Sequence, residues 1–398
     1  MGSGDFKVPG FQFSGISAGI KKDGKKDLGL IYSGVPAQAA GLFTTNAVKA
    51  APVQLDMERI KRGLCQAIIV NSGNANACTG SQGRRDAQRI CSWVAKQLRI
   101  DERLVFPSST GVIGSPLPMK KIEEGIPELI DALSPEGWMS AVEAMMTTDT
   151  FPKVEAATCR LKGKQVKLCG MAKGAGMIRP RLATMLSFLV TDAHIKAPLL
   201  QRMLEKAVEV SYNRITIDGE TSTNDTVLLL ANGRAGHPSL SHMDRDGEIF
   251  QSMLLKVCQN LAESLVKDGE GATKLIEILI QGARNKEDAK QAAYTVAHSP
   301  LVKTAFFGED VNWGRILCAL GHSGAQINPN RIDVFFDKAP IVKNGMGVDA
   351  RLEEKAGQII KKKSFKVIVD LHQGKSHFSV LTTDLSLDYV KINASYRS

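Results

Sequence analysis

Residues 173–192, KGAGMIRPRLATMLSFLVTD, contain a hydroxyl side chain at the point where a loop-like sequence becomes strand-like. Residues 173–181 hold two glycines and a proline, which favour a loop over a helix. Residues 185–190 are nearly all apolar, which is typical of a strand buried on both faces. Thr184 lies at the junction, where a strand can hold a hydroxyl rigidly while the loop admits a substrate. The alternative is an ordinary junction, in which Thr184 only completes backbone hydrogen bonds.

The pattern of this segment is similar to the self-cleavage site of the ornithine acetyltransferase family, the glutamate N-acetyltransferases of arginine biosynthesis. The shared residues are Lys-Gly-x-Gly-Met-Ile-x-Pro-x-x-Ala-Thr-Met-Leu, which occupy positions 173–186. In that family the protein cuts its own chain before the Thr, and the freed Thr is the nucleophile. The resemblance therefore implies cleavage between Ala183 and Thr184 and makes Thr184 the catalytic nucleophile.

Cleavage before Thr184 would also supply the base that its hydroxyl needs. An internal Thr has no free amine, whereas a new N-terminal amine has an ordinary pKa of about 7.7–8.0, which suits general-base work near neutral pH. The hydroxyl would first attack the carbonyl of Ala183, giving an ester that water opens. Cleavage and acyl transfer both pass through a tetrahedral oxyanion, so one oxyanion hole can serve both reactions.

A second candidate feature is the small-residue segment 107–114, PSSTGVIG, which follows the short apolar run 104–106. We expect residues 104–106 to form a strand and residues 107–114 to form a turn. Such a turn can aim backbone N–H groups at an anion. Without the resemblance, a plain strand-to-helix connection explains the segment equally well. The resemblance implies that Thr110 and Gly111 form the oxyanion hole.

The resemblance also implies a set of substrate-binding residues. Lys173 suits a substrate carboxylate, and Glu270, in a Glu-Gly-x-Thr-Lys motif, suits the side-chain amine of ornithine. Each motif has a simpler explanation: a helix cap around Thr150, a solvated loop at Glu270, or a frayed C-terminal tail. The full implied set is Thr150, Lys173, Thr184, Glu270, Asn393 and Ser398.

Other polar segments receive weaker interpretations. We expect residues 71–80 to form a turn-rich loop and residues 216–226 to form a loop that walls the active site. In GEDVNWGR, residues 308–315, Glu309 and Asp310 are expected to be structural. His237 and His242 lack metal-ligand spacing and are expected to lie on the surface. Departures from the family are small: Ala175 replaces a common Ser, and Arg179 and Arg181 flank Pro180.

Composition is that of an ordinary globular enzyme: 398 residues, 43% hydrophobic and 23% charged. No apolar run of about 18 residues predicts a membrane span, and the N-terminus lacks the apolar core of a secretory signal. Seven cysteines without a CxxC pair indicate reduced thiols in a cytoplasmic protein, with no metal and no disulfide framework.

The net charge of +10 raises the alternative of a basic binding protein without enzymatic activity. The positive runs are short, lie beside turn residues and have no interleaved aromatics, so we expect no nucleic-acid binding. Steeply salt-dependent nucleic-acid affinity would favour that alternative. Attraction of anionic substrates such as glutamate is a milder use of the same charge.

The segments predict mixed α and β content, and the length supports two domains, which we place at 1–278 and 279–398. The resemblance, which runs nearly from end to end, implies an α+β fold. Its large domain stacks two β-sheets between helical layers, in the α/β/β/α arrangement also found in DmpA. A smaller C-terminal α+β domain follows, and its tail returns to the active site.

The implied reaction moves the acetyl group from N2-acetylornithine to glutamate by a ping-pong mechanism through acetyl-Thr184. The resemblance implies no cofactor, leaves open acetyl-CoA as a co-substrate, and suggests an α2β2 assembly of the two cleaved chains. A self-processing aminopeptidase or amidase of similar fold is the alternative enzyme, with water as acceptor. Acetyl transfer to glutamate without net hydrolysis separates the two.

Overall fold

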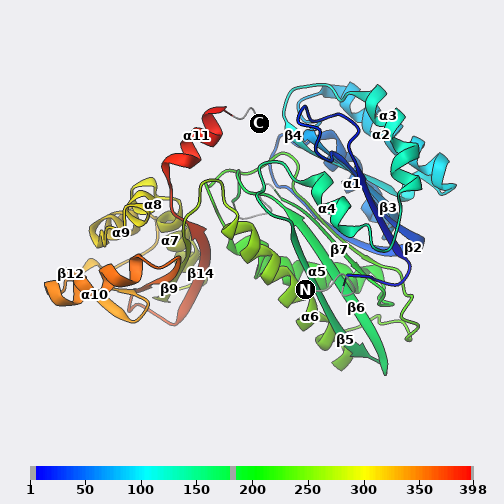
Figure 1. Cartoon of the computed structure of the whole chain (residues 1–398). Coiled ribbons are helices and arrows are strands. Elements are labelled where there is room, and N and C mark those ends of the chain that lie inside the picture. The colour runs from blue at the N-terminus through cyan, green and yellow to red at the C-terminus, as the bar shows by residue number, and fades with distance from the viewer. Residues whose placement is uncertain (1–5, 180–184, 396–398) are drawn as a thin grey trace. The chain divides into compact units, whose positions relative to one another are not determined.

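The computed structural model describes residues 6–179 and 185–395, which form two compact units. One unit holds the chain up to Asn213 together with Glu220–Leu265, and the other holds Arg214–Gly219 and the chain from Val266 onward (Figure 1). None of the helices in these residues combines the length and the apolarity that a membrane crossing requires.

The first unit is built on one mixed eight-stranded sheet. The strand order is β4-β3-β2-β8-β7-β6-β5, with β1 paired to β2. The pairs β3–β4 and β7–β8 are parallel, and the other pairs are antiparallel. The strands are β1 (Phe11–Ile16), β2 (Leu28–Phe43), β3 (Leu64–Asn74), β4 (Val105–Val112), β5 (Lys153–Leu161), β6 (Lys164–Lys173), β7 (Leu186–Thr191) and β8 (Thr226–Ala231).

The long strand β2 divides this sheet into two stacked layers. Its first part pairs with β1 and β3, and its last part pairs with β8. One buried apolar cluster takes side chains from both halves, including Ile68 of β3, Phe188 of β7 and Leu228 of β8. The cluster fills the space between the layers, which confirms the predicted α+β fold with stacked sheets; the two layers are continuous through β2.

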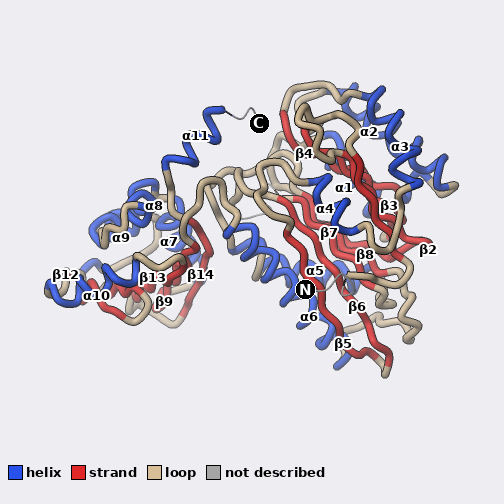
Figure 2. Tube along the Cα trace, viewed as in Figure 1, coloured by secondary structure: helices blue, strands red, loops and turns tan. Residues whose placement is uncertain are grey.

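Helices cover the outer faces because side chains alternate along each strand. Ile68 points into the inter-layer cluster, whereas its neighbour Ile69 packs with α2 and α3. On the other layer, Gly170 of β6 leaves space for Leu261 of α6. Figure 2 shows these helices along the strands. The helices of this unit are α1 (Ala51–Arg59), α2 (Gly80–Leu98), α3 (Met119–Asp131), α4 (Trp138–Met145), α5 (Ala197–Glu209) and α6 (Arg245–Lys267).

Two predicted loops are partly strand in the structure. We expected a loop over 71–80 and a turn over 107–114, but β3 continues to Asn74 and β4 to Val112. The two strands pair in parallel along this whole stretch, where Ser72 lies opposite Thr110. Small polar residues have low strand propensity, yet pairing with a neighbouring buried strand overrides it. The predicted strand at 185–190 is confirmed by β7, whose six residues are all buried.

The second unit is built on a six-stranded mixed sheet of order β12-β11-β10-β13-β9-β14. Strand β9 spans residue 278, where we had placed the domain boundary, whereas the compact units divide at Leu265/Val266. The elements are β9 (Leu275–Ala283), α7 (Lys286–His298), α8 (Pro300–Phe307), α9 (Trp313–Gly321), β10 (Asp333–Phe336), β11 (Ala339–Lys343), β12 (Met346–Gly347), α10 (Ala350–Ile360), β13 (Ser364–Asp370), β14 (Ser376–Thr383) and α11 (Leu387–Ser395).

Asp56 of α1 predicts how stability depends on pH. Its side chain is fully buried, and neither carboxyl oxygen has a hydrogen-bond partner in the described chain. Burial raises the pKa of Asp56 well above 3.8, against the opposing charge of Arg59. An acid with a raised folded-state pKa contributes stability that is fully present below the unfolded value and is lost as pH rises. Asp56→Asn should therefore gain stability relative to the parent between pH 4 and pH 8, measured as the melting temperature.

Asp101→Asn is the matched control, because the pKa of Asp101 is shifted in the opposite direction to that of Asp56. Hydrogen bonds from Arg103 lower the pKa of Asp101 to about 2, so its contribution is lost only under more acidic conditions. The difference between this variant and the parent should stay constant from pH 5 to pH 8. A constant difference for Asp56→Asn over the same range would contradict the assignment of a neutral buried acid.

Candidate active site

Lys173, the last residue of β6, connects three segments of the first unit. Its side chain is 3% exposed, and its Nζ donates hydrogen bonds to Thr110 Oγ1 at 3.1 Å and to Thr147 Oγ1 at 2.8 Å. Thr110 belongs to β4, and Thr147 follows α4. Lys173 therefore fixes the Thr110 hydroxyl to the end of β6. This strand end lies beside the start of β7, because Lys173 pairs with Leu186.

A buried carboxylate balances the charge of Lys173. Asp149 Oδ1 accepts from Lys153 Nζ at 2.6 Å and from Gly174 N at 2.7 Å, and Oδ2 lies 4.0 Å from Lys173 Nζ. Burial alone would raise the pKa of Asp149, but the ammonium groups of Lys173 and Lys153 outweigh it and bring the pKa to about 2. Asp149 is thus ionised at neutral pH, and it ties the turn after α4 to the start of the 174–179 loop.

The Thr110–Gly111 pair sits where β4 meets an irregular stretch of β3. The register between the strands shifts at Gly73 and Asn74. Gly111 has a φ of +131°, and a Cβ there would lie 2.4 Å from the carbonyl carbon of Gly73 and 2.5 Å from Asn74 N. Only glycine fits this close approach. The Thr110 hydroxyl accepts from Lys173 and donates to no acceptor in the described part of the chain, so its proton is available to an oxyanion.

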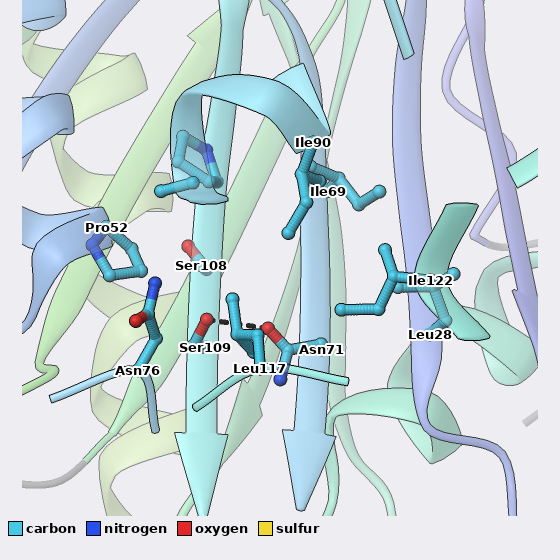
Figure 3. A pocket seen from close by; sticks show the side chains of 12 residues that line it. Leu28, Pro52, Ile69, Asn71, Asn76, Ile90, Ser108, Ser109, Leu117 and Ile122 are labelled. Carbon is cyan, nitrogen blue, oxygen red and sulfur yellow. Dashed lines mark hydrogen bonds between the residues drawn. The ribbon is translucent and has the colours of Figure 1, made fainter. Parts of the chain in front are cut away.

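Two asparagines hold β4 from the other side. Ser109 Oγ donates to Asn71 Oδ1 at 2.6 Å, and Figure 3 shows this bond between neighbouring strands. Asn224 Nδ2 donates to the carbonyl oxygens of Ala75 at 2.7 Å and Ser109 at 2.8 Å. Asn224 lies in the 216–226 loop, which we expected to wall the active site. This end of the loop therefore contacts Ser109, the residue before Thr110.

A small cavity lies beside β4, but it is not a substrate site. Its volume is about 10 Å³, which is room for one water molecule. Figure 3 shows Ser108, Ser109 and Asn71 among mostly apolar side chains around it. The Ser108 hydroxyl is buried and has no hydrogen-bond partner within the described residues. The cavity is therefore too small for any substrate larger than a water molecule.

A second lysine adds positive charge near the oxyanion pair. Lys21 Nζ donates to the carbonyl oxygens of Lys26 at 2.8 Å and Met146 at 2.7 Å, and the Lys21 side chain flanks Gly73. Burial lowers the pKa of Lys21 to about 8; Asp27 and Asp23 oppose this shift, whereas the charge of Lys173 adds to it. The site is therefore electropositive, which favours an anionic substrate and a developing oxyanion.

An acidic side chain, Asp225, hydrogen-bonds the backbone just before β7. Asp225 is fully buried, and its Oδ1 accepts from Met185 N at 3.1 Å. Thr226 N donates to Met185 O at 3.1 Å, which begins the parallel β7–β8 pairing. Asp225 therefore orients the first described residue after position 184.

The second unit brings together two other predicted residues. Asn393 Nδ2 donates to Glu270 Oε2 at 2.9 Å, with Glu270 half-buried and Asn393 exposed. The loop that carries Glu270 is held by Asp384 Oδ1, which accepts from the backbone N–H groups of Thr273 and Lys274. Lys274 also pairs with Glu309 at 3.1 Å, in keeping with the structural role expected for Glu309.

The structure thus joins Thr110 with Lys173 and, separately, Glu270 with Asn393. Thr150 is exposed in the turn that carries Asp149. Ala183, Thr184 and Ser398 lie outside the described residues. Among the described residues, no group of three or more His, Cys, Asp or Glu side chains is arranged to hold a metal ion.

Sequence reasoning missed three residues and misplaced one. Asp149 and Lys153 had the i,i+4 spacing of an ion pair as their only signal, and Asp225 was included only as an unnamed member of the predicted wall segment 216–226. His237 is not a surface residue: it is 3% exposed, and both of its ring nitrogens have partners, since Nε2 accepts from His194 N at 2.9 Å and Nδ1 contacts the Pro238 carbonyl oxygen at 2.7 Å.

Comparison with known proteins identifies relatives over nearly the whole chain. Residues 12–398 match the model of the ArgJ family. The arginine biosynthesis bifunctional protein ArgJ of Geobacter sulfurreducens is 51% identical over 391 residues, covering 98% of this chain and 100% of that protein. The protein of the same name from Syntrophotalea carbinolica is 52% identical over 394 residues, with the same coverage. A crystal structure of ArgJ from Bacillus halodurans is 40% identical, with a TM-score of 0.49, and covers 52% of this chain and 96% of that chain.

Gly111→Ala tests the close approach of β4 to β3. The new methyl group would collide with the backbone of Gly73, and the positive φ adds strain of about 1–3 kcal/mol. We expect a lower melting temperature and loss of self-cleavage and acetyl transfer. Gly114→Ala is the control, because its φ is +81° but its Cβ would meet nothing within 4 Å. Equal activity and stability in the two variants would argue against a steric requirement at Gly111.

Proposed function

The chain belongs to the ArgJ family of arginine biosynthesis, and on this premise we propose that it transfers acetyl from N2-acetylornithine to glutamate through Thr184. The observation that carries the mechanism is the hydrogen bond from Lys173 to the Thr110 hydroxyl beside the start of β7. It sets a hydroxyl donor and a buried cation next to the strand that follows Thr184. A hydroxyl nucleophile and an oxyanion donor held by rigid strands are the parts that acyl transfer requires.

Self-cleavage comes first in this proposal. The Thr184 hydroxyl attacks the carbonyl carbon of Ala183, the C–N bond breaks, and the proton passes to the new α-amine. Water then opens the Ala183 ester and releases a carboxylate. The Thr110 hydroxyl and the backbone at Gly111 stabilise the oxyanion, and Lys173 keeps the Thr110 oxygen oriented so that its proton faces the substrate side.

Acetyl transfer repeats the same chemistry on a small molecule. The α-amine of Thr184 takes the hydroxyl proton while the oxygen attacks the acetyl carbon of N2-acetylornithine. The proton then goes to the departing amine of ornithine, leaving an acetyl ester on Thr184. The amine of glutamate attacks this ester, and N-acetylglutamate leaves. One covalent intermediate that serves two amines in turn gives ping-pong kinetics.

The substrate contacts are proposed from side-chain chemistry and from the family resemblance. The ammonium of Lys173 suits an α-carboxylate, and Thr150 borders the same turn. Glu270 suits the side-chain ammonium of ornithine, and Asn393, already hydrogen-bonded to Glu270, and Ser398 complete the set. No cofactor is needed for this scheme, because every proton moves between Thr184 and its substrates.

Acetyl-CoA is a proposed second acetyl donor. The curated relatives carry the word bifunctional in their names, and a thioester would load Thr184 by the same attack. Purified protein should be assayed for glutamate acetylation with acetyl-CoA and, separately, with N2-acetylornithine. We further propose a cytoplasmic α2β2 assembly of the two cleaved chains, which light scattering of the processed protein tests.

Hydrolysis by an amidase of similar fold is the competing activity. The match over residues 12–398 favours the transferase. Transfer of labelled acetyl from N2-acetylornithine to glutamate, with little free acetate, supports it. Predominant release of acetate would instead identify a hydrolase.

Thr110→Ala should slow self-cleavage and acetyl transfer together. Removing one oxyanion donor typically costs on the order of 10²–10³ in rate. Thr110→Ser keeps the hydroxyl that meets Lys173 and should retain most activity. The measurements are the cleavage half-time by gel and kcat for acetyl transfer. Unchanged rates in Thr110→Ala would remove this residue from the oxyanion hole.

Substitutions of Thr184 are the most direct test of the proposed function. The expressed chain should convert to two fragments, the second beginning at Thr184. Thr184→Ala should remain intact and lack transferase activity, because it has neither the attacking hydroxyl nor a freed amine. Thr184→Ser should retain part of both reactions, and Thr184→Cys should cleave to some degree.

Intact-protein mass spectrometry with N-terminal sequencing identifies the fragments. Thr191→Ala, which alters a Thr at the far end of β7, is the matched control and should still cleave. Fragments that begin elsewhere, or an active uncleaved Thr184→Ala protein, would show that Thr184 is only a strand-entry residue.

A further inference from the structure

The hydroxyl of Ser386 connects the two segments of the second unit that carry Glu270 and Asn393. Its Oγ donates to the carbonyl oxygen of Gly271, the residue after Glu270, at 2.6 Å. The same Oγ accepts from Tyr389 N at 3.3 Å, which is the bond that an N-cap residue makes at the start of a helix, here α11. Ser386 is 5% exposed, so water has little access to either bond. One buried hydroxyl thus sets the Glu270 loop (residues 270–274) against the helix that carries Asn393.

Gly271 allows the backbone of the Glu270 loop to meet the start of α11. Its φ is +65°, and a Cβ at this position would lie 2.4 Å from Tyr389 N and 2.7 Å from Ser386 Oγ. Only glycine combines this backbone conformation with so close an approach. A side chain at Gly271 would collide with both groups that form the N-cap bond. The sequence of the loop is therefore matched to its contact with the helix.

Asp384 holds the other end of the Glu270 loop. Its Oδ1 accepts from Thr273 N at 2.8 Å and from Lys274 N at 3.0 Å, and its Oδ2 accepts from the Thr273 hydroxyl. Asp384 is buried, as is the ammonium of Lys303, which supplies a positive charge near it. Burial lowers the pKa of Lys303 to about 7, and the charges of Asp384 and Asp218 oppose this shift. Three hydrogen bonds to one buried carboxylate leave the loop little freedom to shift.

The Glu270 carboxylate has no cation beside it in the described part of the chain. Its Oε2 accepts from the neutral amide of Asn393 at 2.9 Å. Lys274, in the same loop, pairs instead with Glu309 at 3.1 Å. A half-buried carboxylate with a neutral partner suits an ammonium group of a ligand. The position of that ammonium is set by the two residues that hold the loop, Ser386 and Asp384.

We propose that Ser386 and Asp384 are positioning residues that fix the Glu270 carboxylate beside Asn393 and so make the site select the side-chain length of N2-acetylornithine. The inference rests on the proposed contact between Glu270 and the side-chain ammonium of ornithine. A carboxylate held in one place suits an ammonium at the end of a chain of one length. A carboxylate on a mobile loop can follow chains of different lengths. Neither positioning residue touches the substrate, and no covalent bond forms or breaks at either.

Ser386→Ala removes both bonds of the hydroxyl without changing any charge. The measured quantity is the ratio of kcat/KM for N2-acetylornithine to kcat/KM for N2-acetyllysine, its homologue with one more methylene, with glutamate as acceptor. One methylene typically changes kcat/KM by about 10–200-fold, and the parent ratio should lie in this range. In Ser386→Ala the ratio should fall about tenfold, because KM for N2-acetylornithine rises while kcat stays within about threefold of the parent. Self-cleavage uses no small-molecule substrate, so its rate should equal that of the parent.

Two serine variants are matched to Ser386→Ala. Ser386→Thr keeps a hydroxyl at the same position and should retain the parent ratio. Ser323→Ala removes a similar hydroxyl from the same unit, after α9. That hydroxyl donates to Leu320 O at 2.7 Å and accepts from Ala325 N at 3.2 Å. Because this serine has no contact with the Glu270 loop, its loss should leave the ratio unchanged.

A pair of Asp384 variants tests the second positioning residue. Asp384→Asn keeps an oxygen that can accept from the N–H groups of Thr273 and Lys274, and it should retain most of the parent ratio. Asp384→Ala has no such acceptor and should lower the ratio as Ser386→Ala does. Because it also leaves Lys303 without a nearby counter-charge, Asp384→Ala can fail to fold. In that case Ser386→Ala, which buries no new charge, decides the proposal.

A parent-like ratio in Ser386→Ala would overturn the proposal, because Glu270 would then be fixed without this hydroxyl. Loss of self-cleavage in Ser386→Ala would also overturn it, since Ser386 would then support folding in general. Glu270→Gln tests the premise separately and should raise KM for N2-acetylornithine. An unchanged KM in Glu270→Gln would refute the proposed substrate contact. A raised KM there, together with a parent-like ratio in Ser386→Ala, would refute the positioning role alone.

Discussion

The buried carboxylate of Asp149 is the interaction on which the candidate site depends. Removing an ionised carboxylate from water is expensive unless cations and hydrogen-bond donors surround it. Lys153, Lys173 and Gly174 N provide them, and the side chains of Asp149 and Lys153 are wholly inaccessible to solvent. No member of this group can move alone without leaving a buried charge uncompensated. The group therefore fixes the end of β6, and through Lys173 it fixes the Thr110 hydroxyl.

The stacked layers explain how Lys173 can contact both the Thr110 hydroxyl and the turn that carries Asp149. Thr110 lies in the β1–β4 layer and Lys173 in the β5–β8 layer, and the two layers are continuous through β2. The apolar cluster between them holds their separation, because interiors are packed too densely to allow independent shifts. At the edge of this cluster, the turn after α4 carries Thr147 and Asp149 from one layer to the other. The polar site is thus positioned by an apolar core.

Local patterns were enough to predict the elements but not their contacts. The apolar run at 185–190 identified β7 because such a pattern is short-range. Thr110 and Lys173 are 63 residues apart, and only the resemblance brought both into one predicted site. The extent of β3 and β4 could not be predicted, because small polar residues there become strand only through pairing. Asp225 meets Met185 from 40 residues away, and no periodicity marks such a contact.

The start of β7 lies between a buried lysine and a buried acid, and the two side chains act on it in different ways. Leu186 pairs with Lys173 on one side and with Thr226, next to Asp225, on the other. A lysine suits the oxyanion that forms in both reactions, so it is needed from the beginning. Asp225 instead accepts a hydrogen bond from Met185 N. Before the cut, burial favours the neutral acid, which costs less than an uncompensated carboxylate. The neutral carboxyl of Asp225 can therefore orient Met185 without adding a buried charge beside Lys173, which Asp149 already balances.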